Sequence, residues 1–98
     1  MARGSKAPAI NTDSAYSRRK QLRSLQSRLT TMEKKLSSLH PELARTEQQL
    51  ADADLYLSER RETLQATQKR HQQLRQEISD LEALWLARSE EFERLQEK

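Results

Sequence analysis

Two stretches of the chain carry mainly apolar residues at alternating spacings of three and four. In the first stretch these positions are Leu22, Leu25, Leu29, Met32, Leu36, Leu39, Leu43, Thr46 and Leu50. In the second they are Leu64, Thr67, His71, Leu74, Ile78, Leu81, Trp85, Arg88, Phe92 and Leu95. A repeat of about 3.5 residues held this long keeps one seam of a helix facing a partner, as in a coiled coil. The pattern predicts two long helices packed along these seams.

The segment between the two stretches breaks the pattern, so we expect the chain to fold back on itself there. When the seams are paired antiparallel, the numbers of facing residues add to the same total for every pair, from Leu22–Leu95 to Leu50–Thr67. This register centres the turn at Ser58 and Glu59. The predicted fold is all-α: a two-helix antiparallel coiled-coil hairpin with a disordered N-terminal tail.

The expected organisation is one domain. Residues 1–16 are small, polar and turn-forming, and we interpret them as a disordered linker or an expression remnant. Residues 17–97 form the coiled coil, with helix 1 at about 17–52, a turn at about 53–58 and helix 2 at about 59–96. Pro41 interrupts helix 1 at an outward position, which predicts a kink. A short break at His40 is the alternative.

Composition narrows the class of protein. The chain has 98 residues with 34% hydrophobic and 34% charged content, too little apolar surface for a thick globular core. It has no cysteine, so disulfides and thiolate metal sites are excluded. No apolar run is long enough for a membrane helix, and no membrane partner is expected. We expect a cytoplasmic protein that is a monomer, with weak self-association as an alternative.

Catalytic chemistry is not expected of a hairpin without a cleft. The sequence has no phosphate-binding glycine loop, paired carboxylates or nucleophile constellation, so we predict no catalytic residue, metal site or cofactor in this chain. His71 is interpreted as a seam residue, and Trp85 and Phe92 as core anchors. Arg88 should cover the seam with its stem and turn its guanidinium outward. Tyr56 either packs over the hairpin end or stacks on a partner.

Positive charge is concentrated at the start of the chain. Residues 1–40 hold nine Lys or Arg and two acids, whereas residues 41–98 hold nine Lys or Arg and thirteen acids. Pairing of the basic first helix with the acidic end of the second accounts for much of this asymmetry. The less compensated cations are candidates for nucleic-acid binding, because clustered cations neutralise phosphates. They are Arg60, Arg61, Lys69 and Arg70 near the turn, and Arg18, Arg19 and Lys20 at the start of helix 1.

Three short stretches resemble a known family. They are the turn LADADLY at 50–56, the run from Leu84 to Leu95 with Trp85 and its acidic residues, and the basic start SRRK at 17–20. They are similar to the C-terminal coiled-coil domain of ABC-F ATPases, nearest the YheS-like branch and next the Uup-like proteins. Ala53 departs from the proline that many members have in the turn.

The resemblance implies an arm excised from a protein that binds ATP and Mg and hydrolyses ATP in two cassettes. Family members act at the ribosome near the exit-tRNA site, so the resemblance implies contact with ribosomal RNA, another nucleic acid or the parent's cassettes. Two alternative hypotheses for the function remain. One is a protein-interaction or intramolecular regulatory coiled coil that binds no nucleic acid, and the other is an unrelated tRNA-binding arm.

Overall fold

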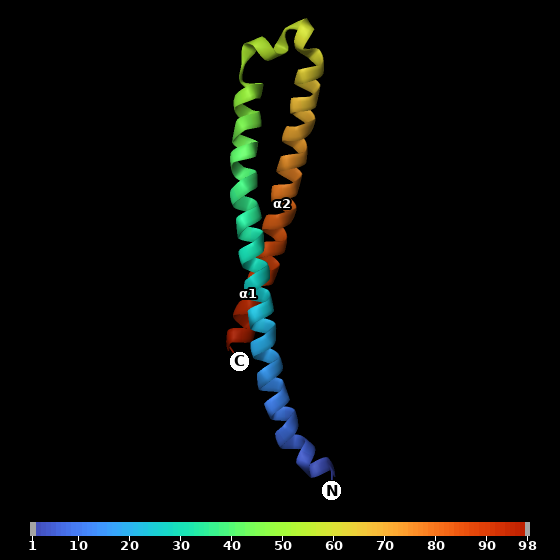
Figure 1. Cartoon of the computed structure of the whole chain (residues 1–98), viewed down its shortest axis with the longest axis vertical. Coiled ribbons are helices and arrows are strands. Elements are labelled where there is room, and N and C mark those ends of the chain that lie inside the picture. The colour runs from blue at the N-terminus through green and yellow to red at the C-terminus, as the bar shows by residue number, and fades with distance from the viewer. Residues whose placement is uncertain (1, 98) are drawn as a thin grey trace.

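The computed structural model describes the backbone of residues 2–97 and the side chains of residues 14–97. Helix α1 (Ala2–Leu50) and helix α2 (Arg61–Glu97) lie antiparallel, joined by two short 3-10 helices, η1 (Ala53–Tyr56) and η2 (Ser58–Arg60). The molecule is a rod of 82 × 19 × 14 Å with the turn at one end (Figure 1). The predicted all-α helical hairpin is confirmed.

The seam predicted from the apolar repeat is the buried surface of both helices. Every one of its positions is buried or half-buried. On α1 the most buried positions recur every seven residues, at Leu25, Met32, Leu39 and Thr46. The central core holds Leu39, Leu74 and Ile78, with Leu36, Leu43 and Leu81 packed against it. These are the facing pairs that the antiparallel register predicts, so the register is confirmed.

The helices form because their residues favour helical backbone and do not interrupt it. From Ser14 to Leu50 the chain has no glycine and is rich in Leu, Arg, Lys, Gln and Glu, which have high helix propensity. Several side-chain hydroxyls donate hydrogen bonds to backbone carbonyls of the preceding turn. The Thr30 hydroxyl donates to the Gln26 carbonyl and the Thr31 hydroxyl to the Ser27 carbonyl, each at a distance of 3.0 Å. These bonds satisfy side chains that would otherwise compete for the backbone.

The N-terminal bound of the first helix differs from the expectation. Helix α1 begins at Ala2, upstream of residue 17, so the backbone of the segment expected to be disordered is helical from residue 2. This segment extends past the C-terminal end of α2 (Figure 1). It therefore lacks the neighbouring helix that stabilises the rest of α1, since most helical stability in proteins comes from packing. Its role as a linker stays a prediction.

Pro41 does not divide the first helix. Helix α1 is continuous from Ala2 to Leu50, and Pro41 lies exposed on its surface. The alternative of a break at His40 is therefore wrong. The kink predicted at Pro41 stays a prediction.

The turn is longer than predicted and has its own structure. Helix α1 ends at Leu50 and α2 begins at Arg61, so the connection is wider than residues 53–58. The Asp52 carboxylate accepts a hydrogen bond from the Asp54 backbone N–H at 3.0 Å, which caps η1. The Tyr56 hydroxyl donates to the Leu50 carbonyl at 2.7 Å. Leu55 is only 4% exposed and closes the end of the core.

Candidate interaction surfaces

The four cations predicted near the turn do not form one surface. Each is exposed, but at about 100° per residue Arg61 and Arg70 fall on opposite flanks of α2, with Lys69 between them. One Nη atom of Arg70 lies 3.1 Å from both carboxylate oxygens of Glu42 on α1. Arg70 is therefore compensated across the hairpin, contrary to the expectation from sequence.

The turn itself is acidic. Residues 51–62 contain four acids and two arginines, a net charge of −2. The acids are Asp52, Asp54, Glu59 and Glu62, and all are exposed. Tyr56 and Leu57 are also about half exposed here, at 54% and 49%. We call residues 51–62 the tip. Its charge weakens the case for a phosphate-binding site at Arg60 and Arg61, because phosphates are repelled by carboxylates.

The cations at the start of α1 form a stronger basic surface. Arg19 and Lys20 are exposed and Arg18 is half-buried. Arg23 and Arg28 follow on the same helix, and residues 14–32 contain no acid. None of these five cations forms an ion pair with a side chain that the structure describes. The tip and this basic segment lie at different ends of the hairpin (Figure 1).

The basic surface continues along the outward face of α1. Heptad positions that point away from α2 carry no acid from Tyr16 to Arg45. They hold exposed cations among serine and threonine hydroxyls; the cations are Lys20, Arg23, Lys34 and Arg45. The first and last of these lie about 38 Å apart at 1.5 Å per residue. The sequence prediction included only Lys20, although the missing acids at outward heptad positions could have revealed the face.

The ion pairs between described side chains do not bear out the expected pairing of the basic first helix with the acidic end of the second, because no Lys or Arg of α1 pairs with Glu90, Glu91 or Glu93. Lys35 Nζ lies 3.6 Å from Glu77 Oε2, and His40 Nε2 lies 3.9 Å from Glu82 Oε2. All of these side chains are at least 41% exposed, so each pair contributes little to stability.

Polar seam residues are satisfied by neighbours at the edge of the seam. The Trp85 indole N–H donates to Glu33 Oε2 at 3.0 Å, while its ring is half-buried as the anchor expected there. His71 Nε2 lies 3.2 Å from Glu47 Oε2 rather than bonding to Thr46, whose hydroxyl donates to the Leu43 carbonyl. His71 is thus a seam residue, as predicted.

Arg88 turns along its own helix. Its Nη1 lies 3.1 Å from Glu91 Oε1, one turn later. This is an ion pair without hydrogen-bond geometry, because Glu91 Oε1 is buried without a hydrogen-bond partner. The Nε atom of Arg88 is also buried without a partner. The Arg88 side chain is 32% exposed and its guanidinium Nε is buried, so the guanidinium does not turn fully outward as expected.

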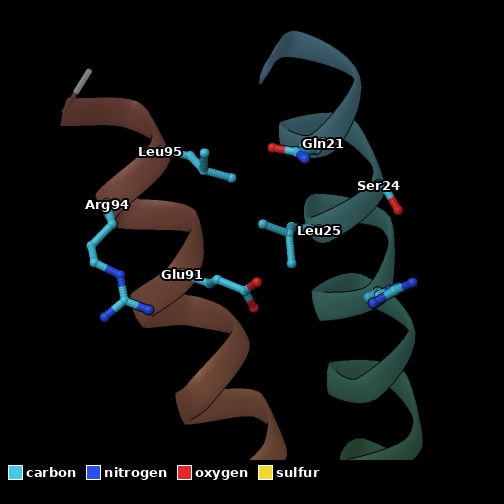
Figure 2. Close-up of a pocket in the computed structure, with 7 residues that line it drawn as sticks. Gln21, Ser24, Leu25, Glu91, Arg94 and Leu95 are labelled. Atoms are coloured by element: carbon cyan, nitrogen blue, oxygen red, sulfur yellow. The ribbon is translucent and has the colours of Figure 1, made fainter. Parts of the chain in front are cut away.

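An open groove lies between the helices at the end opposite the tip. The larger part of the groove has a volume of about 380 Å³. It is lined by Gln21, Ser24, Leu25, Arg28, Glu91, Arg94 and Leu95. Figure 2 shows Leu25 and Leu95 extending into the gap between the helices, with Glu91 reaching toward α1. A smaller part adjoins it through Arg28 and is lined by Ser27, Thr31, Met32, Leu84 and Arg88. We call the two parts the base groove.

The described residues offer no arrangement for metal chemistry. Among them, no group of three or more His, Asp or Glu side chains is placed to hold a metal ion. Nor does any described helix have the length and apolar character needed to cross a bilayer.

Comparison with known proteins identifies the family. Residues 20–90 match the family described as ABC transporter C-terminal domain, a range that holds the first seam, the whole tip and the second seam as far as Arg88. No curated protein and no solved structure matches the chain. The match spans more than half of the 98 residues and coincides with the helical hairpin. The chain therefore belongs to the family of ABC transporter C-terminal domains, and it is a helical arm of such a protein rather than its ATPase cassette.

Proposed function

We propose that this arm contacts nucleic acid, and that it does so through the basic surface of α1. The observation that carries the proposal is the run of cations from Arg18 to Arg28, which has no acid within residues 14–32 and no ion-pair partner among the described side chains. Unpaired cations can neutralise phosphates and release counterions without first breaking an internal ion pair.

The outward face of α1 supports a contact with the backbone rather than with bases. Its exposed lysines and arginines alternate with serine and threonine hydroxyls, which are side chains that bond to phosphate oxygens. The anchoring aromatic Trp85 is half-buried in the seam and is not free to stack on a base. We therefore expect binding with little sequence preference and a steep dependence on salt.

The resemblance to ABC-F proteins suggests where such an arm acts. In this proposal the parent protein works at the ribosome, its two cassettes bind ATP and Mg and hydrolyse ATP, and the arm touches ribosomal RNA. The same basic surface could equally meet DNA, since phosphates are common to both. The arm contributes contact and position, and no step of ATP hydrolysis.

The test compares two variants that remove the same number of cations. One carries Arg18→Gln, Arg19→Gln and Lys20→Gln; the other carries Arg60→Gln, Arg61→Gln and Lys69→Gln. Binding to ribosomes and to short RNA and DNA duplexes is measured over a range of salt concentrations. We expect the first variant to lose affinity and to reduce the salt slope by up to about 3 for a duplex, with a smaller effect from the second. Absence of binding at low salt, or unchanged binding by the first variant, would refute the proposal.

A second candidate is a protein-docking or intramolecular regulatory coiled coil, and the tip favours it. The tip is acidic and exposes Tyr56 and Leu57, which suits a protein surface better than phosphates. Docking on the parent's cassettes would depend weakly on salt and would leave nucleic acid unbound. The same titration therefore separates the two candidates.

A further inference from the structure

The base groove and the tip have complementary chemistry. The groove combines an apolar floor that includes Leu25 and Leu95 with three arginines and a single acid, a net charge of +2 among its lining residues. Leu84, at its edge, is 47% exposed. The tip combines exposed Tyr56 and Leu57 with a net charge of −2. The tip could therefore bind in the base groove of another copy, because apolar contact gives affinity and opposite charge gives orientation.

One acid of the tip and the base groove lie on one side of the rod. Positions spaced by seven on a coiled-coil helix share a flank. On α2 such a series runs from Thr63 near the tip, through Arg70 and Glu77, to Leu84 and Glu91 in the base groove. Glu62 lines a shallow surface with Thr63 and Arg70 at the tip end of this flank. Glu62 of the tip and the base groove thus lie at two ends of the same face.

The middle of this flank is electrically compensated. Glu77 pairs with Lys35, and Arg70 pairs with Glu42, all within one molecule. A second rod lying against the flank would meet neither strong attraction nor repulsion at its centre. Charge at the two ends therefore decides how such a pair is oriented.

We propose that two copies of this chain associate side by side and antiparallel, with the tip of each seated on the base groove of the other. A two-fold axis across the middle of the flank places both contacts at once, since an isologous interface uses the same patch on each copy. Parallel association would instead set acidic tip against acidic tip and basic groove against basic groove. The occupant of the groove in this proposal is the tip of a second copy, including Tyr56, Leu57 and Glu62.

The test uses charge reversal and mixing. The groove variant carries Arg28→Glu and Arg94→Glu, and the tip variant carries Glu59→Arg and Glu62→Arg. All four side chains are exposed, and none forms an ion pair with a described side chain, so the hairpin should still fold, which circular dichroism verifies. The control carries Arg23→Glu and Arg75→Glu, which changes the net charge as the groove variant does, but on exposed side chains away from the groove flank. Sedimentation equilibrium gives the dimer dissociation constant for each.

We expect the unaltered chain and the control to dimerise, with an affinity that falls as salt is raised. Each reversal variant alone should dimerise at least about tenfold more weakly, because like charges then meet at both ends. An equimolar mixture of the two variants should restore a heterodimer, because both tip–groove contacts regain opposite charge. A chain that stays monomeric at every concentration, reversal variants that dimerise as tightly as the parent, or a mixture that fails to associate would each overturn the proposal. Nucleic-acid binding is measured separately, so its failure leaves this result unaffected.

Discussion

Leu74 is the position at which truncation should damage the hairpin most. It is 0% exposed and belongs to the core cluster with Leu39 and Ile78. Replacing a fully buried leucine by alanine removes its transfer free energy and leaves a cavity, which together cost about 2–5 kcal/mol. A rod only two helices thick can collapse partly around the gap, so we take about 3 kcal/mol for Leu74→Ala. In a domain of this size that lowers the melting temperature by roughly 12–24 °C.

The assay is thermal unfolding followed by far-ultraviolet circular dichroism, with Leu86→Ala as the matched control. Leu86 lies on the same helix and loses the same atoms, but it is 55% exposed. Its truncation should change the free energy of unfolding by no more than about 0.5 kcal/mol. If both variants melted at the same temperature, the seam would not be what holds the two helices together, and the energetic argument from burial would be refuted.

Three smaller perturbations test single contacts by the same melting measurement. Pro41→Ala should raise the free energy of unfolding by up to about 3 kcal/mol, because α1 is continuous there and alanine restores the missing donor; a decrease would mean that the proline shapes the helix. Tyr56→Phe removes the hydrogen bond to the Leu50 carbonyl and should cost about 0.5–1.5 kcal/mol, whereas no change would show that the turn does not need it. A double-mutant cycle on Arg70 and Glu42 should give a coupling of about 0.2–1 kcal/mol that weakens with salt, and a salt-independent coupling would contradict a surface ion pair.

Periodicity was sufficient to predict the hairpin because burial repeats along both helices. Each seam position named from the spacing is buried or half-buried, including the polar His71 and Arg88. The register followed as well, since the three residues of α1 and the three of α2 that it sets against each other form one cluster: Leu36, Leu39, Leu43, Leu74, Ile78 and Leu81. A coiled coil is predictable in this way because its core depends on residues at fixed spacing rather than on distant, irregular contacts.

The tip was predictable in place but not in structure. Its position followed from the break in the repeat, whereas the burial of Leu55 and the bond from Tyr56 to Leu50 did not. Both depend on how the connection turns in space, which no spacing specifies. The same is true of the candidate site: Arg70 appeared to be uncompensated in the sequence and is paired with Glu42 in the structure.

By itself, the sequence determined the fold class, the two seams, their antiparallel register and the basic character of the first helix. Tertiary structure decided which charges remain available. Whether a cation is free depends on the side chains that the opposite helix brings within a few ångströms, and such pairs lie far apart in the chain. The joining of Leu25, Met32, Leu84 and Leu95 with three arginines into one groove was likewise decided only when the helices packed. Local spacing fixes which face of a helix is buried, and the packing of the two helices fixes what the exposed faces can bind.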